Sequence, residues 1–213
     1  MLDTLQHKGR RRQLIDQLSK SYPFHPAVLE AMERVPRHLF IEKGLDLFAY
    51  VDKPLPIGAS QTISQPYTVA MQTHLLALAK WDKVLEIGTG CGYQTAVLME
   101  LGLHVFSIER QRTLYLLAQK NLAALGYTSM QLHYGDGFEG LPQFAPFQGI
   151  LITCGAAQTP TTLLSQLAVG GRMVAPVGSE VQTMTVIERV DENRFEEQTF
   201  GSYSFVPMLP GTR

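Results

Sequence analysis

The chain has 213 residues, of which 45% are hydrophobic, and this size suits one α/β domain with an N-terminal addition rather than two full domains. Its formal net charge is -1 with charges of both signs interspersed, so no overall field favours a nucleic acid or an anionic membrane as partner. The two cysteines have no metal-ligand spacing to another cysteine or to a histidine, so we expect neither a metal site nor a disulfide.

The chain begins with two expected helices. An amphipathic helix is expected over residues 11–19, and the basic cluster at residues 8–12 is expected to cap or solvate it rather than to bind nucleic acid. Pro26 fits the first turn of a second helix, which Pro36 ends. No basic-then-apolar leader and no apolar run of membrane-spanning length is found, so we expect a cytoplasmic location.

The next segment is irregular before a third helix. Residues 37–58 mix aromatics with proline and glycine, show no period, and predict a connector with a short helix near Leu45. Pro66 suits the first turn of a helix that continues to Ala79. Ser64 stands at its start, where it can cap the helix or face a carboxylate brought to the free amides. The local sequence alone favours capping over catalysis.

The stretch from Val84 to Gly92, VLEIGTGCG, has the pattern of a buried strand followed by a glycine turn. Its branched apolar residues suit a strand that is buried on both faces. Gly88, Gly90 and Gly92 let the backbone take unusual dihedrals and bring its amides close to a ligand. Because a periodic apolar helix follows at once, the stretch predicts a ligand-binding corner of a parallel sheet.

The spacing within this corner helps to choose the ligand. Dinucleotide sites carry G-x-G-x-x-G, whereas these glycines run G-x-G-x-G, with Glu86 inside the strand. A second strand, HVFSIER, ends in Glu109 roughly twenty residues further on, where such folds place a carboxylate on ribose hydroxyls. Both features resemble the class I S-adenosylmethionine methyltransferases, and they favour cofactor binding over a purely structural turn.

Strands and helices continue to alternate after this acid. A helix closed by Gly126 leads to a third strand that ends in GDG, with Asp136 at the edge where ligands bind in open sheets. A carboxylate there can accept from an adenine amino group, and the alternative is an aspartate that only makes a turn. FQGILITCGA, TPTTLLSQLA and GGRMVAPVG predict a fourth strand, a helix and a fifth strand. Two β runs joined by DENR predict an antiparallel hairpin at the sheet edge.

Together these elements predict an α/β fold. We expect a doubly wound, mostly parallel sheet of the Rossmann-like methyltransferase type, with an N-terminal helical extension and a C-terminal β-hairpin. We expect one domain over residues 1–213, with a helical and connector segment (1–80), a cofactor-binding core (81–178) and the hairpin (179–213).

Several motifs along nearly the whole length point to one family. They are YVDKPLPIGASQTISQPY, VLEIGTGCGYQTAVL with the following SIER, HYGDG, GGRMVAPVG and FVPM. On these motifs the chain resembles bacterial and archaeal protein-L-isoaspartate O-methyltransferases, and PLPIG followed by QTIS and a proline is the most specific. The resemblance implies methyl transfer from S-adenosylmethionine to the free α-carboxyl of an L-isoaspartyl residue in a damaged protein or peptide. The ester then collapses to a succinimide, whose opening returns some normal aspartyl.

The resemblance also implies the site residues. Ser64 matches the family's active-site serine in QTIS, which moves our interpretation from capping to catalysis, although the two roles can coexist. The residues expected to bind the cofactor are Glu86, Gly88, Thr89, Gly90, Glu109, Arg110, Asp136 and Gly137. The residues expected to contact the substrate are Thr62, Ile63 and Val206.

The expected reaction needs little chemistry from the protein. An α-carboxyl ionises at about pH 3.5, so at neutral pH the nucleophile is already formed and no strong base is required. The protein has to hold the carboxylate oxygen, the methyl carbon and the sulfur in line. We expect a monomer that acts on isoaspartyl-containing proteins and peptides, without nucleic acid or membrane.

Two other functions stay open at this point. One is a class I methyltransferase that acts on a small-molecule acceptor, and the other is an inactive cofactor-binding scaffold that recognises peptides, which the intact glycines, Glu109 and Ser64 argue against. The chain also departs from the family pattern at Ala59, Ser60 and Val69 and in the short LPGTR segment after FVPM. These departures bear on how the cofactor's amino-acid end and the substrate backbone are held.

Overall fold

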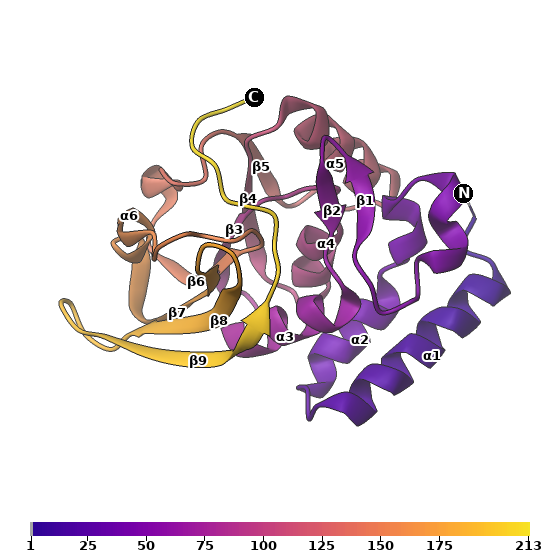
Figure 1. Cartoon of the computed structure of the whole chain (residues 1–213), viewed down its shortest axis with the longest axis horizontal. Helices are drawn as coiled ribbons and strands as arrows, with labels where there is room; N and C mark the ends of the chain where they lie inside the picture. The colour runs from indigo at the N-terminus through magenta and orange to yellow at the C-terminus, as the bar shows by residue number, and fades with distance from the viewer. Residues whose placement is uncertain (1) are drawn as a thin grey trace.

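Seven strands form the central sheet in the order β5-β4-β3-β6-β7-β8-β9 (Figure 1). The computed structural model describes residues 2–213. The strands are β3 (Lys83–Ile87), β4 (His104–Glu109), β5 (Gln131–Tyr134), β6 (Phe147–Ile152), β7 (Leu167–Val177), β8 (Gln182–Arg189) and β9 (Phe195–Tyr203). The four pairs from β5 through β4, β3 and β6 to β7 are parallel, whereas β8 pairs antiparallel with β7 and β9. The predicted mostly parallel α/β sheet with an antiparallel hairpin at its edge is confirmed.

The strand order reverses at β3, which fixes the place where a ligand can bind. From β3 the chain moves outward through β4 to β5, and it then returns to β6 on the other side of β3. Parallel α/β sheets bind ligands outside the carboxyl ends of the strands at such a reversal. The candidate site is therefore expected beyond Ile87, Glu109 and Ile152.

Both faces of the sheet are covered, as the apolar β3 sequence predicts. Val84 and Leu85 are both fully buried, one in the core on each face of the sheet. One face is covered by long helices, among them α4 (Tyr93–Glu100) and α5 (Arg112–Ala124). The other face is covered by short elements, η3 (Pro142–Phe144) and α6 (Thr161–Leu164).

The helix predicted from TPTTLLSQLA is shorter than expected. It is reduced to the single turn of α6, and β7 begins at Leu167, before the glycines that were taken as its start. Leu167 pairs with Phe147 on β6, so the demand for strand pairing overrides the local helical pattern.

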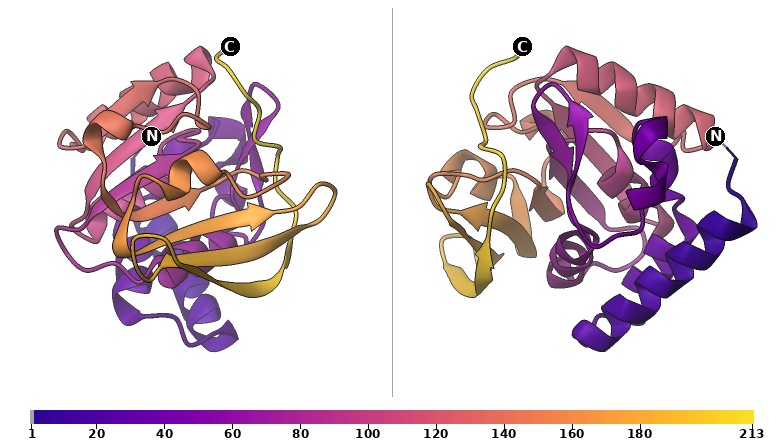
Figure 2. Two further views of the ribbon diagram at one scale, coloured as in Figure 1. Left: turned by 90° about the vertical axis from the view of Figure 1, so that its left-hand side faces the viewer. Right: turned by 45° about the vertical axis from the view of Figure 1, so that its right-hand side comes forward.

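The N-terminal region adds helices and a small hairpin. Its elements are α1 (Leu5–Ser21), α2 (Pro26–Arg34), η1 (Arg37–Phe40), η2 (Lys43–Phe48), β1 (Leu55–Gly58), β2 (Gln61–Ile63) and α3 (Pro66–Leu76). α1 starts earlier than predicted because Thr4 and His7 form a capping box at its start. The β1–β2 hairpin was not predicted, and it lies beside the segment after β9 in all views (Figure 2). Within residues 2–213, no helix is both long enough and apolar enough to cross a bilayer.

The start of α3 differs from the capping interpretation of Ser64. The N-cap residue is Gln65, and no side-chain hydrogen bond caps the helix from that position. Instead, Asp52 accepts from the Tyr67 amide at 2.8 Å through Oδ1 and from Gln65 Nε2 at 3.0 Å through Oδ2. The hydroxyl of Ser64 is thus not used as a cap. The helix also ends at Leu76 rather than at Ala79, because Ala77 takes a left-handed conformation.

Candidate functional site

The glycine turn after β3 forms the floor of the site. Gly88, Gly90 and Gly92 all have positive φ angles, of 97°, 58° and 91°. A Cβ atom on Gly88 would lie 2.5 Å from Thr153 Oγ1, so only glycine fits at this position. The turn is therefore open to a ligand without side chains in the way.

Glu109 holds this turn in place from the end of β4. Its Oε2 accepts from the Gly90 amide at 2.9 Å, and its Oε1 accepts from the Gln111 amide at 2.8 Å. Only 5% of the residue is exposed. Because each carboxylate oxygen has a second lone pair, Glu109 can also accept from the two hydroxyls of a ribose.

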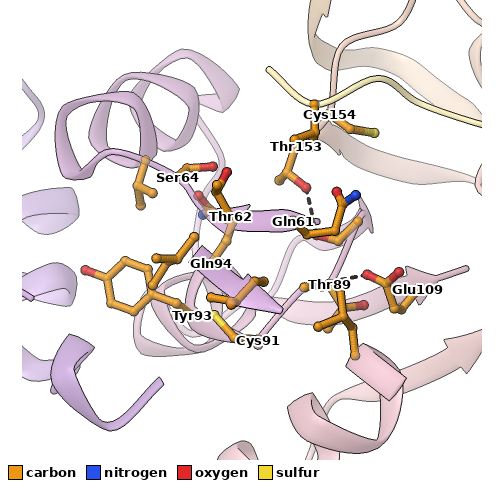
Figure 3. Close-up of a pocket in the computed structure, with 17 residues that line it drawn as sticks. Gln61, Thr62, Ser64, Thr89, Cys91, Tyr93, Gln94, Glu109, Thr153 and Cys154 are labelled. Atoms are coloured by element: carbon orange, nitrogen blue, oxygen red, sulfur yellow. Dashed lines mark hydrogen bonds between the residues drawn. The ribbon is translucent and has the colours of Figure 1, made fainter. Parts of the chain in front are cut away.

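Two adjoining cavities lie over the floor. The inner cavity has a volume of about 530 Å³. The edge cavity has a volume of about 480 Å³ and shares Gln61, Gly88, Glu109 and Cys154 with it. The residues that line the inner cavity include Ile57, Thr62, Ile63, Ser64, Thr89, Gly90, Cys91, Tyr93, Gln94, Thr153 and Val206 (Figure 3).

Ser64 lies where the inner cavity meets a third opening, the outer groove, of about 1060 Å³. Thr62, Thr153 and Val206 line both spaces as well. Figure 3 shows Ser64 and Thr62 on one side of the cavity and Thr153 with Cys154 on the other. Within residues 2–213, the Ser64 hydroxyl has no hydrogen-bond partner, so it is available to a group that reaches the junction.

Glu86 lies behind the floor and not in a cavity. Its side chain is fully buried, and Oε2 accepts from Thr95 Oγ1 at 2.5 Å and from Ser107 Oγ at 2.6 Å. Oε1 has no partner among the described residues. Burial raises the pKa of this carboxyl to about 7, against the lowering effect of the two hydroxyls. Ser107 is also bonded to Thr89 at 2.6 Å, which links Glu86 to the turn indirectly.

The three remaining predicted cofactor residues, Arg110, Asp136 and Gly137, follow the ends of β4 and β5. Gly137 and Arg110 line the edge cavity, whereas Asp136 does not. Asp136 Oδ1 accepts from the Phe138 amide at 2.9 Å, and Oδ2 accepts from the Gly211 amide. The Arg110 guanidinium donates to the carbonyls of Pro210 and Gly211.

Comparison with known proteins identifies the family. Residues 9–212 match the family model described as protein-L-isoaspartate(D-aspartate) O-methyltransferase. The chain belongs to this family. It is 51% identical over 209 residues to a protein-L-isoaspartate O-methyltransferase of Christiangramia forsetii and 50% identical over 209 residues to one of Flavobacterium psychrophilum, with 98% of each chain covered. The predictions of the family, of an O-methyltransferase and of S-adenosylmethionine as methyl donor are confirmed.

Solved structures agree with this assignment. A structure named protein-L-isoaspartate O-methyltransferase matches with a TM-score of 0.85 and 29% identity, over 92% of this chain and 65% of that chain. A second structure, from Plasmodium falciparum in complex with S-adenosyl-L-homocysteine, shares the fold with a TM-score of 0.82 at 20% identity.

The residues present fit the cofactor of this family. The glycine turn leaves room for a ligand next to the backbone, and Glu109 offers acceptors at the end of β4. The two adjoining cavities run from the glycine turn to Gly137, so both ends of an elongated adenosyl compound have a place.

Sequence reasoning missed residues on both walls of this site. Thr153 follows β6, and its hydroxyl donates to the carbonyls of Ile87 at 2.9 Å and Gly88 at 2.7 Å, which ties β6 to the turn. Its place at the carboxyl end of a parallel strand was a usable signal. Gln61, Met208 and Leu209 carry no such signal, because they lie outside the parallel core.

Proposed function

We propose that this chain transfers the methyl group of S-adenosylmethionine to the free α-carboxyl of L-isoaspartyl residues in damaged proteins and peptides. One observation carries the proposal, namely the position of the unpartnered Ser64 hydroxyl between the inner cavity and the outer groove. A methyl donor in the first space and an acceptor carboxylate in the second would meet at this residue. The family match over residues 9–212 supports the same reaction.

The proposed mechanism relies on positioning. When bound, S-adenosylmethionine supplies a methyl group that its sulfonium has already activated. The acceptor carboxylate is ionised at neutral pH, so no residue has to remove a proton. None of the described residues that line the two cavities and the groove is a histidine or a lysine, which agrees with a reaction without a general base.

The residues of this chain then have distinct tasks. We assign Ser64 to donate a hydrogen bond to one oxygen of the acceptor carboxylate, which leaves the other oxygen free to attack. Thr62 and Val206, which line both spaces, and Ile63, which lines the inner cavity, are assigned to the substrate. Gly88, Thr89, Gly90 and Glu109 are assigned to the cofactor.

The outer groove favours a peptide over a small-molecule acceptor. It is larger than the inner cavity, and aromatic rings of Tyr67, Tyr203 and Phe205 line it. Such rings give apolar contact area to residues that flank a modified aspartate. A small-molecule acceptor would leave most of this surface uncovered.

The proposal is tested with a peptide that contains isoaspartate and with its normal aspartyl twin. Radiolabel from the cofactor should enter the first peptide and not the second, and equal labelling of both would reject the repair function. Ser64→Ala should lower kcat/KM for the isoaspartyl peptide roughly tenfold to a hundredfold, as expected for one hydrogen bond to a charged group. Cofactor affinity should stay unchanged, and a loss confined to cofactor affinity would contradict the role of Ser64. Ser179→Ala, which removes an exposed hydroxyl in the turn before β8, is the matched control.

Three broader expectations also belong to this proposal. We place the protein in the cytoplasm, in keeping with two free cysteines at Cys91 and Cys154. We propose a monomer that does not bind nucleic acid, which light scattering and a binding assay with mixed RNA can test. We treat residues 1–213 as one domain with the divisions given above.

A further inference from the structure

Arg37, on η1, is a fully buried arginine that contacts the wall of the inner cavity. Its Nε donates to the Ala49 carbonyl at 3.0 Å, and its Nη2 makes a longer contact of 3.5 Å to the Lys53 carbonyl. Among residues 2–213, Nη1 has no partner and the guanidinium forms no ion pair. Burial lowers the pKa of this group. Burying a guanidinium without a carboxylate costs free energy, which the contacts of Arg37 have to offset.

One set of these contacts leads from Arg37 toward Ser64. Both carbonyls that Arg37 contacts belong to the strap, which we define as residues 49–53. Asp52, within the strap, accepts two hydrogen bonds from the start of α3, at 2.8 and 3.0 Å. Ser64 immediately precedes the N-cap residue of this helix. Arg37 therefore supports the start of α3, and with it Ser64, through the strap.

A second contact leads from Arg37 to the glycine turn. Its Cζ lies over the ring of Tyr93, 4.9 Å from the ring centroid. Tyr93 is the first residue of α4, directly follows Gly92 of the turn, and lines the inner cavity. A guanidinium is attracted to an aromatic face, most strongly where both groups are desolvated, and only 3% of Tyr93 is exposed. Arg37 is thus fixed to the residue that continues the glycine turn.

Together the two sets of contacts place Arg37 between two halves of the site. The donor half is the glycine turn with Tyr93, where the cofactor is proposed to bind, and the acceptor half is the start of α3 with Ser64. Figure 3 shows Tyr93 and Ser64 on the same side of the inner cavity, across from Thr153 and Cys154. Because a guanidinium is planar and carries several donors in a fixed arrangement, it can hold the strap and cover the ring at the same time.

We propose that Arg37 is a positioning residue that sets the distance between the methyl donor and the acceptor carboxylate by joining these two halves. The inference rests on the proposed function for the identity of the acceptor. Without Arg37, Glu109 still holds the glycine turn and Asp52 still holds α3, so each half keeps its own contacts. Their alignment is lost, and in-line transfer is sensitive to small displacements of the reacting atoms. Loss of Arg37 therefore lowers kcat rather than the binding of either ligand.

The test compares the wild type with two Arg37 variants and one control. Arg37→Gln removes the charge, whereas Arg37→Lys keeps a cation for the Tyr93 ring but has no fork to reach both strap carbonyls. The control is Leu18→Ala, which opens a cavity at a buried residue of α1 that lines none of the three spaces of the site. For each protein we measure kcat and KM with an isoaspartyl peptide, the affinity for S-adenosylhomocysteine by calorimetry, and the melting temperature.

We expect Arg37→Gln to lower kcat about tenfold to a hundredfold, with KM and the affinity for S-adenosylhomocysteine within about twofold of the wild type. Arg37→Lys should recover part of the lost kcat. Leu18→Ala should lower the melting temperature and leave kcat unchanged. Unchanged kcat in folded Arg37→Gln, or an equal fall of kcat in Leu18→Ala, would overturn the proposal. A loss of cofactor affinity that accounts for the whole fall in kcat/KM would overturn it as well.

The route through the strap is tested by combining Arg37→Gln with Asp52→Ala. Because both residues support the start of α3 in series, the double variant should lose about as much kcat as the more impaired single variant. Losses that multiply would show that Arg37 does not act through Asp52, and they would overturn the proposed route.

Hydrogen exchange gives a reading that needs no isoaspartyl substrate. The Tyr67 amide, which donates to Asp52, should exchange roughly tenfold faster in Arg37→Gln, while the Gly90 amide held by Glu109 keeps its protection. Unchanged exchange at Tyr67 would overturn the proposal. If Arg37→Gln fails to fold, Arg37→Lys carries the same comparisons with smaller changes in the same direction. A chain that shows the expected exchange but does not methylate isoaspartyl peptide would reject the proposed function and leave the coupling of the two halves standing.

Discussion

Replacing Glu86 with glutamine should remove a pH-dependent loss of stability. Glu86 is fully buried behind the glycine turn, its pKa is raised to about 7 by burial, and one of its oxygens has no partner among the described residues. Glutamine keeps an oxygen for the hydroxyls of Thr95 and Ser107 and never carries the charge. The substitution therefore mimics the protonated carboxyl at every pH.

The sign and size follow from proton linkage. The folded protein holds the Glu86 proton up to about pH 7, whereas the unfolded chain releases it near the ordinary value of 4.5. Between these values the folded state binds more protons, so the free energy of unfolding falls as pH rises. The rise from 4.5 to about 7 corresponds to about 3 kcal/mol, at roughly 1.4 kcal/mol per pKa unit. Full stabilisation is present below the unfolded pKa and is lost above the folded one.

Urea unfolding at pH 5.0 and pH 8.0 measures this effect as a difference between proteins. Burial lowers the pKa of His38, His74 and His133, and those groups give the opposite slope, so the wild-type curve alone is a mixture. Subtracting the curve of Glu86→Gln isolates the glutamate, and Glu180→Gln at an exposed position is the control. The variant should gain about 2 to 3 kcal/mol relative to the wild type between the two pH values, which is less than the full effect because pH 5.0 already lies above the unfolded pKa. A difference that does not change with pH would refute the reasoning.

Two further predictions concern the elements that carry Ser64. Ser60 has a φ of 56° in the β1–β2 turn, a left-handed conformation that strains a residue with a Cβ atom. Relief of this strain in Ser60→Gly should outweigh the greater chain entropy of glycine and raise the free energy of unfolding by about 0.5 to 1 kcal/mol. A thermal melt measures the change. No rise in melting temperature would show that the turn is not strained. Asp52→Ala should lower the free energy of unfolding by about 1 to 2 kcal/mol, because it removes the side chain that caps α3. It should also lower kcat/KM for the isoaspartyl peptide, because the start of the helix, next to Ser64, becomes less well fixed. A variant that loses stability but keeps full activity would show that the cap does not help to position Ser64.

The parallel core could be predicted because its signals are local. A buried strand, a glycine turn and a helix start stand next to each other in the sequence from Val84 to Gly92. Glu109 follows at a distance that the βαβ unit fixes. The structure joins these residues through the bond from the Gly90 amide to Glu109, and physical reasoning from the sequence alone anticipated their proximity.

The walls of the site could not be predicted in the same way. The cap of α3 comes from Asp52, which is 15 residues before the amide that it accepts from, and no local pattern marks it. The β1–β2 turn uses positive φ at Ala59 and Ser60, where neither residue type is a usual sign of a tight turn. Residues 207–213 contact Arg110 about a hundred positions earlier in the chain, so only the folded structure reveals their place.

Gly90 lies between the glycine turn, which the sequence predicted, and the β1–β2 hairpin, which it did not. Its amide is held by Glu109 from below, and a Cβ atom on it would lie 3.3 Å from Ile57 Cδ1 on the β1–β2 hairpin above. Ser64 directly follows β2 of this hairpin. The distance between the hairpin and the glycine turn therefore also sets how far the Ser64 hydroxyl lies from that turn. If the cofactor binds at this turn as we propose, a side chain at position 90 would crowd it and would also press on Ile57 of the hairpin. The glycine pattern, which from sequence indicates a ligand contact, is therefore equally a constraint on where the acceptor carboxylate is held.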